Sequence, residues 1–377
     1  MSESHFHILC IDDDEFMLKA THRLLRRLKP EWEMDFISDP LSWEQHVDPN
    51  RPPALILSDL LMPKLQGDEL LKQVAQRFPR TVRALITGDS SRDIPALAGA
   101  NVHFILPKPF TEDDFSYVLD SVERLSHLPL SDEARDKLAG FEDLPVLPSR
   151  IRKIHQALRD TDSDLSHIAL MVSEEPALVA RLLQLANSAY LGFGKPTMSV
   201  EVAVNRLGTT VTGALATCML SQKVFSQVSA QEHQEIVERY LKLAGLSRNL
   251  SKHLNVSKSR QESTYLAALM SALGELVVME MGGSQDDIDT LSTIEPGRRD
   301  AFVITSYILI LWGYSLDIAN IVLASEESSP MTAMPENEGQ IIRLCHQWMK
   351  LETQEKQNEF CQQFSPQIGH FFQDWPE

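Results

Sequence analysis

The chain has 377 residues, a length that usually corresponds to two or three domains, and 43% of them are hydrophobic, which is enough to fill buried cores. The formal net charge is -18, and this acidic balance argues against a nucleic-acid partner, because binding to phosphate backbones depends on clustered lysine and arginine. The four cysteines form no Cys-x-x-Cys pair, as is typical of a reduced, intracellular protein. No apolar run reaches about 18 residues and the start MSESH is polar, so we expect a cytoplasmic protein with no membrane partner.

Short apolar runs alternate with amphipathic stretches as far as residue 125. The runs lie near residues 9, 35, 54, 83 and 103. Each is short enough for a strand, and each stretch between them is long enough for a connecting segment or helix. This rhythm predicts repeated βα units and a parallel sheet.

Acidic, hydroxyl and ammonium side chains stand where four of these predicted strands end: Asp12, Asp13, Asp59, Thr87 and Lys108. Mg²⁺ prefers oxygen ligands from a few carboxylates, and an aspartate can act as a nucleophile that carries a phosphoryl group. A lysine and a hydroxyl suit the charge that develops on such a group. Any one aspartate could instead cap a helix or lie in a solvated loop. Because ligands bind at the carboxyl ends of parallel strands, the ordered set favours a Mg²⁺ and phosphoryl site.

The segments ILCIDDDE, LILSDLLMPKLQGDEL, ALITG and FILPKPF resemble those of response-regulator receiver domains. The resemblance covers residues 5 to 125 and implies a flavodoxin-like α/β domain with a five-stranded parallel sheet. It implies that Asp59 is phosphorylated by a sensor histidine kinase or a phosphotransfer protein. The Mg²⁺ would be bound directly by Asp13, indirectly or through water by Asp12, by Asp59, and by the backbone carbonyl of Leu61.

The same resemblance implies that Thr87 and Lys108 contact the phosphoryl oxygens. One position departs from the family pattern. Ile105 stands where these domains usually carry a Tyr or Phe that moves with the threonine. The neighbouring Phe104 would point to the other face of a strand, so the usual aromatic switch is not expected here.

The pattern changes after the first domain. Residues 126 to 140 contain a proline and several charges, and we expect a linker that runs into a short helix. From Asp132 onward the periodicity is helical, with no credible strand. Gly208 stands where a helix-ending glycine is expected. The amide of Asn187 lies in an otherwise apolar helix and needs hydrogen-bond partners, which indicates a structural role at a helix junction.

The segments LPVLPSRIRKI, EEPALVARLLQLANSAYLG and SVEVAVNRLG resemble those of HDOD domains, relatives of HD phosphohydrolases that usually lack their metal site. The resemblance covers residues 141 to 330 and implies an all-α bundle. Ser271-Ala272 stand where the His-Asp pair would be, and Ala301 and Ser325-Glu326 stand where further histidines would be. No histidine occurs between His253 and His346, so a polyhistidine centre cannot be assembled there.

Two other features of the helical half have an ordinary explanation. The segment GFGKPT lacks the spacing of a phosphate loop, and its proline removes a backbone donor. The isolated histidines are interpreted as surface or hydrogen-bonded residues, namely His155, His167, His233 and His253.

Residues 331 to 377 form a C-terminal extension whose aromatic side chains are too many to be simply solvated: Phe360, Phe364, Phe371, Phe372 and Trp375. They could pack on the chain's own bundle or offer a surface to a partner.

We therefore expect a response regulator in which a phosphorylatable receiver controls a non-catalytic HDOD module that acts through an unidentified protein partner. Phosphorylation adds charge to a two-state domain, and the output surface then changes its exposure or its dimerisation, which leaves a homodimer open. The alternatives are a degenerate HD-type phosphohydrolase and a module that binds a small signalling molecule.

Overall fold

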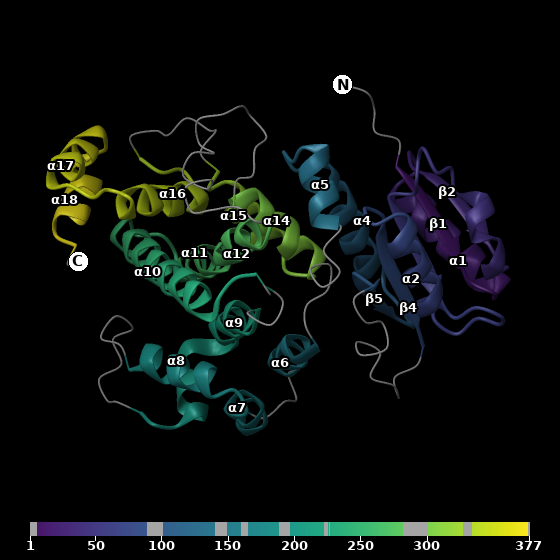
Figure 1. Cartoon of the computed structure of the whole chain (residues 1–377), viewed down its shortest axis with the longest axis horizontal. Helices are drawn as coiled ribbons and strands as arrows, with labels where there is room; N and C mark the ends of the chain where they lie inside the picture. The colour runs from purple at the N-terminus through teal and green to yellow at the C-terminus, as the bar shows by residue number, and fades with distance from the viewer. Residues whose placement is uncertain are drawn as a thin grey trace. The chain divides into compact units, whose positions relative to one another are not determined.

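The computed structural model describes residues 6–88, 101–139, 149–159, 165–187, 197–221, 225, 227–281, 301–326 and 334–375 (Figure 1). The chain divides into two compact units. The first contains residues 1–149 together with 310–314, and the second contains residues 150–309 and 315–377.

Five strands form one parallel sheet in the first unit, in the order β2-β1-β3-β4-β5. This is the flavodoxin-like order of a doubly wound domain, so the expected fold class is confirmed. The central strands β3 and β4 are buried along their whole length, which explains why they appear in the sequence as continuous apolar runs. The strands are β1 (His7–Ile11), β2 (Glu33–Ile37), β3 (Leu55–Asp59), β4 (Val82–Thr87) and β5 (Phe104–Pro107).

Helices cover both faces of this sheet. A 3-10 helix and α2 pack on one face through a cluster of buried side chains that includes Leu9, Trp43 and Leu70. On the other face α1 contacts α4, where Lys29 forms ion pairs with Asp120 and Glu123. The helical elements of this unit are α1 (Glu15–Leu28), η1 (Pro40–His46), α2 (Gly67–Arg77), α4 (Glu112–His127) and α5 (Asp132–Ala139).

The second unit is helical throughout its described residues, which confirms the all-α class expected from residue 132 onward. Its first helices are α6 (Ser149–Arg159), α7 (Leu165–Ser173), α8 (Pro176–Ala186), α9 (Val200–Leu220) and α10 (Ala230–His253). They continue as α11 (Lys258–Met270), α12 (Ala272–Glu280), α14 (Ala301–Leu311) and α15 (Leu316–Leu323). The C-terminal extension forms α16 (Glu338–Met349), α17 (Gln354–Gln363) and α18 (Pro366–Gln373).

Two sequence predictions about helix junctions are confirmed. Gly208 interrupts α9 with a φ of 79°, a conformation that favours glycine, and the helix is kinked there. The Asn187 amide follows α8 and makes two hydrogen bonds with Thr197, donating to its carbonyl at 2.8 Å and accepting from its N–H at 2.7 Å. Asn187 therefore ties the end of α8 to Thr197, two residues before Ser199, the N-cap of α9.

The aromatic C-terminal extension packs within its own unit. Phe360 and Phe372 are buried, and the ring of Phe372 stacks on Trp348 of α16 with centroids 4.8 Å apart. The Gln367 side chain donates to the His253 carbonyl at 3.2 Å, while the Gln367 carbonyl lies 3.1 Å from His253 Nε2. Of the two possibilities for these aromatic residues, packing on the bundle is confirmed.

One stretch of the described chain is long and apolar enough to cross a membrane. It spans Lys258–Glu280, which is α11 followed directly by α12. The stretch qualifies by its length and average hydropathy, and by this criterion the expectation that no apolar run is this long was wrong. In the structure 83% of that apolar window is buried among the other helices. The core helix of a globular bundle has the same composition.

Candidate functional site

The carboxyl ends of four strands bring the predicted site residues together. Asp12 follows β1, Asp59 ends β3, Thr87 ends β4, and Lys108 follows β5. Asp12, Asp59 and Thr87 are buried, whereas Asp13 is exposed. The parallel pairing places all these strand ends at one edge of the sheet, as the sequence predicted.

The Lys108 ammonium lies between two of the carboxylates. Its Nζ is 2.5 Å from Asp59 Oδ1 and 3.1 Å from Asp12 Oδ2. The Lys108 N–H also donates to the Thr87 carbonyl at 2.6 Å, which joins the ends of β4 and β5. Burial lowers the pKa of Lys108, but its hydrogen bonds to Asp59 and Asp12 outweigh burial and raise the pKa above its ordinary value. Lys108 is therefore a fixed positive charge.

Backbone N–H groups orient both buried carboxylates. Asp12 Oδ1 accepts from the Asp14 N–H at 2.9 Å, and Asp59 Oδ2 accepts from the Leu61 N–H at 2.9 Å. Burial raises the pKa of Asp12, while these contacts from Asp14 and Lys108 act against burial without cancelling it. The two carboxylates are thus held in place before any ligand binds.

The acidic residues fit a divalent cation. Asp12, Asp13 and Asp59 each offer a carboxylate oxygen, and these oxygens lie within 4.8 Å of one another. Among the described residues no other group of three or more His, Cys, Asp or Glu meets this criterion. An all-oxygen set of carboxylates is the kind of site that Mg²⁺ prefers.

Gly67 is a site residue that the sequence analysis did not single out. A Cβ atom at this position would lie 2.0 Å from the Asp59 carbonyl oxygen, so only glycine allows α2 to begin this close to the end of β3. Its N–H donates to the Leu60 carbonyl at 3.0 Å. The available signal was a glycine at a helix start shortly after the candidate phosphoacceptor.

Ile105, at the position of the usual aromatic switch, and its neighbour Phe104 lie on opposite faces of β5. Phe104 is buried, and its ring meets that of Tyr117 in α4 at a centroid distance of 6.0 Å. Ile105 packs against the buried cluster on the face covered by η1 and α2. The loop after Thr87 lies outside the described residues from position 89 onward.

In the helical unit, packed backbone fills the place where the sequence lacks the His-Asp pair. Ser271 and Ala272 are fully buried at the junction of α11 and α12. The Thr305 hydroxyl accepts from the Gly274 N–H at 3.0 Å and lies 2.7 Å from the Ala301 carbonyl oxygen. A Cβ atom on Gly274 would lie 1.8 Å from the same oxygen, so the backbones of α12 and α14 are in direct contact.

The isolated histidines of this unit have protein partners or face solvent. Nε2 of His155 is 2.8 Å from the Thr217 hydroxyl, and Nε2 of His233 is 3.2 Å from the Ser221 hydroxyl. His253 contacts the Gln367 carbonyl, and His167 is exposed. These observations agree with the interpretation of the four as hydrogen-bonded or surface residues.

Two family models match the chain. The response regulator receiver domain matches residues 8–120, and the HDOD domain matches residues 144–292. The chain joins a receiver domain to an HDOD domain. This architecture supports a response regulator of two-component signalling.

The receiver–HDOD chain also resembles individual proteins over about a third of its length. It is 29% identical to a protein of Treponema pallidum over 137 residues, which are 36% of this chain and 26% of that protein. It is 29% identical to the hydrogenase transcriptional regulatory protein HoxA of Cupriavidus necator over 126 residues, which are 33% of this chain and 25% of HoxA. The matched part thus spans about a quarter of each curated relative.

The chain is also similar to solved structures. The signal receiver domain of an HD domain-containing protein from Pseudomonas fluorescens is 26% identical, with a TM-score of 0.30, and the match covers 33% of this chain and 98% of that one. A protein from Shewanella amazonensis described as a metal-dependent phosphohydrolase is 18% identical, with a TM-score of 0.46, and the match covers 70% of this chain and 98% of that one.

Proposed function

We propose that the receiver domain is phosphorylated on Asp59 and that this modification controls the HDOD domain. The observation that supports the proposal is the position of Asp59, which ends a buried strand. Its Oδ1 lies 2.5 Å from Lys108 Nζ. Its carboxylate also belongs to a cluster in which oxygens of Asp12, Asp13 and Asp59 lie within 4.8 Å of one another. Such a site contains a nucleophile, a fixed cation and the ligands for a metal.

The phosphoryl donor is a histidine kinase or a phosphotransfer protein. A carboxylate oxygen of Asp59 forms a bond to phosphorus while the bond between phosphorus and the donor imidazole nitrogen breaks. That nitrogen keeps the bonding electron pair, and the imidazole, protonated on its other ring nitrogen, leaves as the neutral base. Asp12, Asp13, Asp59 and the Leu61 carbonyl would hold Mg²⁺, which would supply positive charge to the phosphoryl oxygens. Lys108 and the Thr87 hydroxyl bind the oxygens of the transferred group.

The HDOD domain acts through a downstream protein partner rather than as a hydrolase. Direct backbone contact between α12 and α14, fixed by Thr305 and Gly274, supports this proposal, because it fills the place where ligands of an HD enzyme would be needed. The receiver–HDOD architecture and the acidic balance are consistent with a cytoplasmic protein that binds neither membrane nor nucleic acid.

Labelling with a small phosphodonor in the presence of Mg²⁺ tests the proposal. The parent chain should gain one phosphoryl group, and Asp59→Asn should gain none. Asp35→Asn, which changes an exposed acid on β2, is the matched control and should be labelled like the parent. Equal labelling of Asp59→Asn would remove Asp59 as the phosphoacceptor.

The metal proposal has its own test. Calorimetric titration with Mg²⁺ should detect binding to the parent and to Asp35→Asn, and Asp13→Asn should lose both this binding and phosphorylation. An unchanged titration in Asp13→Asn would contradict the proposed ligand set.

Elemental analysis and an activity assay of the full chain test the non-catalytic role of the HDOD domain. A tightly bound equivalent of iron, manganese or zinc, or turnover of cyclic dinucleotides, would refute this role.

A further inference from the structure

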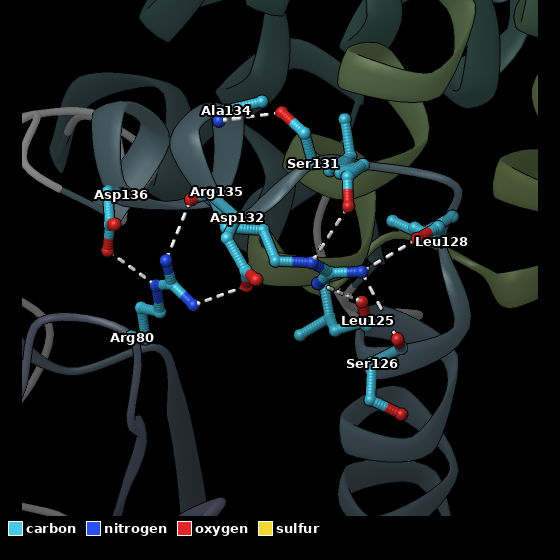
Figure 2. A network of polar contacts seen from close by, with 10 residues as sticks. Arg80, Leu125, Ser126, Leu128, Ser131, Asp132, Ala134, Arg135 and Asp136 are labelled. Atoms are coloured by element: carbon cyan, nitrogen blue, oxygen red, sulfur yellow. Dashed lines mark hydrogen bonds and ion pairs between the residues drawn. The ribbon is translucent and has the colours of Figure 1, made fainter. Parts of the chain in front are cut away.

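The chain that leaves α4 folds back onto the receiver unit as α5 (Figure 2). α4 ends at His127, and Leu128 and Pro129 interrupt the helix. The Ser131 hydroxyl then accepts from the Ala134 N–H at 3.1 Å and begins α5. These residues are thus an ordered part of the first unit, within the segment expected to be a linker.

Arg135 of α5 caps the end of α4. Its guanidinium donates to the carbonyls of Leu125 and Leu128 at 2.7 Å each, to that of Ser126 at 3.1 Å and to that of Leu130 at 3.3 Å (Figure 2). The last carbonyls of a helix have no partner within the helix and carry partial negative charge. A half-buried cation that satisfies several of them is therefore a substantial attachment.

Arg80, in the turn before β4, holds the other side of α5. Its Nε is 2.6 Å from Asp136 Oδ1, Nη1 is 2.9 Å from Asp132 Oδ1, and Nη2 donates to the Asp132 carbonyl at 2.7 Å. The Asp132 and Asp136 side chains are 89% and 65% exposed, so water screens these ion pairs. This second attachment is weak enough to be reversible.

The two attachment points belong to elements that lead to the phosphorylation site. Arg80 precedes β4, which ends at Thr87, and α4 follows β5 and Lys108. Once Asp59 carries a phosphoryl group, Lys108 gains new oxygen partners, and its present contacts with Asp59 and Asp12 must be redistributed. Because the Lys108 N–H donates a hydrogen bond to the Thr87 carbonyl, this change acts on the ends of both β4 and β5.

We infer that α5 is a clip, by which we mean a helix attached both to the turn before β4, through Arg80, and to the end of α4, through Arg135. We infer further that phosphorylation of Asp59 releases α5 from these attachments. The hydrogen bonds of Arg135 with the end of α4 and those of Arg80 with α5 are directional. Both sets cannot keep their geometry when α4 and the turn before β4 shift against each other. Release frees residues 128–139 from the receiver unit. The inference rests on the proposed function, because it requires a phosphoryl group on Asp59.

Hydrogen exchange of the full chain, measured by mass spectrometry, tests the clip first without any phosphoryl mimic. Arg135→Gln should speed the exchange of amides in residues 128–139 by about tenfold, since it removes a charged helix cap. Arg80→Gln should have a smaller effect of about twofold to fivefold, because its partners are exposed. Arg77→Gln, which removes an ion pair with Glu44 at the end of α2, is the matched control and should leave this segment unchanged.

The same measurement with Mg²⁺ and beryllofluoride tests the release. Exchange in residues 128–139 should become faster in the parent and stay unchanged in Asp59→Asn. Unaltered exchange of this segment in both Arg135→Gln and Arg80→Gln would overturn the clip. If beryllofluoride changes the exchange of the loops at Asp13 and Asp59 but not that of residues 128–139, the release is overturned and the proposed function is left intact. If it changes the exchange of no part of the parent, the proposed function is refuted, and the inference with it.

Discussion

Lys64 lies in the turn after β3 with a φ of 70°, a left-handed conformation that a residue with a Cβ rarely adopts. Its ion pair with Asp39 offsets little of this strain, because the two side chains are 60% and 50% exposed. Lys64→Gly should therefore raise the free energy of unfolding of the receiver domain by about 0.5 to 1 kcal/mol. Lys64→Ala, which keeps the strain and loses the pair, should not. Denaturant titration of the two variants measures the difference, and equal stabilities would contradict this explanation.

His346 is a half-buried histidine of α16, in the C-terminal extension. Its ring meets those of Tyr240 and Phe302, and its Nδ1 has no hydrogen-bond partner among the described residues. Burial, together with the charges of Lys350 and Arg239, lowers its pKa from 6.5 to about 3. Between these values the unfolded chain binds the proton more tightly, so the stability is complete above pH 6.5 and is lost as the pH falls toward 3.

His346→Phe removes this titration. Between pH 7 and pH 5 the parent should lose about 2 kcal/mol of stability that the variant keeps. The exposed His370→Gln is the control and should behave like the parent. Denaturant unfolding at several pH values measures how the free energy of unfolding changes with pH. Parallel dependences for the parent and His346→Phe would show that His346 binds its proton equally well in the folded and unfolded states, so that its pKa is not lowered by folding.

At the scale of the elements, the junction of α12 and α14 depends on one hydroxyl. Thr305→Val would leave the buried Gly274 N–H without its partner, which should cost about 1 to 3 kcal/mol. Thr305→Ser keeps the hydroxyl and should cost less. Calorimetric unfolding of the two variants compares them. If valine and serine destabilise the HDOD domain equally, the hydrogen bond is not what fixes this junction.

The elements that the sequence predicted well are those with local signals. The strand that ends at Asp59 is a continuous apolar run because it is buried on both faces, and Gly208 interrupts α9 because its backbone requires a positive φ. The attachment of α5 had no local signal. Asp132 and Asp136 appear in the sequence as ordinary solvated charges, and their partner Arg80 lies more than 50 residues earlier in the chain.

At the scale of the whole molecule, the gathering of Asp12, Asp59 and Lys108 was predictable because parallel strands bring their carboxyl ends to one edge of the sheet. The close approach of Gly67 to Asp59 was not, since it depends on where α2 begins in space. The aromatic extension was ambiguous in the sequence for a similar reason. Phe360 and Phe372 are compatible with a partner surface until Trp348, contributed by α16, is seen to cover them.

We propose that phosphorylation of Asp59 changes the state of the whole molecule. Sedimentation velocity of the full chain over a range of concentrations detects both a change of shape and dimerisation. With Mg²⁺ and beryllofluoride the sedimentation coefficient of the parent should shift, while Asp59→Asn should show no shift. An unchanged coefficient at every concentration, in a parent chain whose Asp59 is saturated with the mimic, would contradict control of the HDOD domain by the receiver.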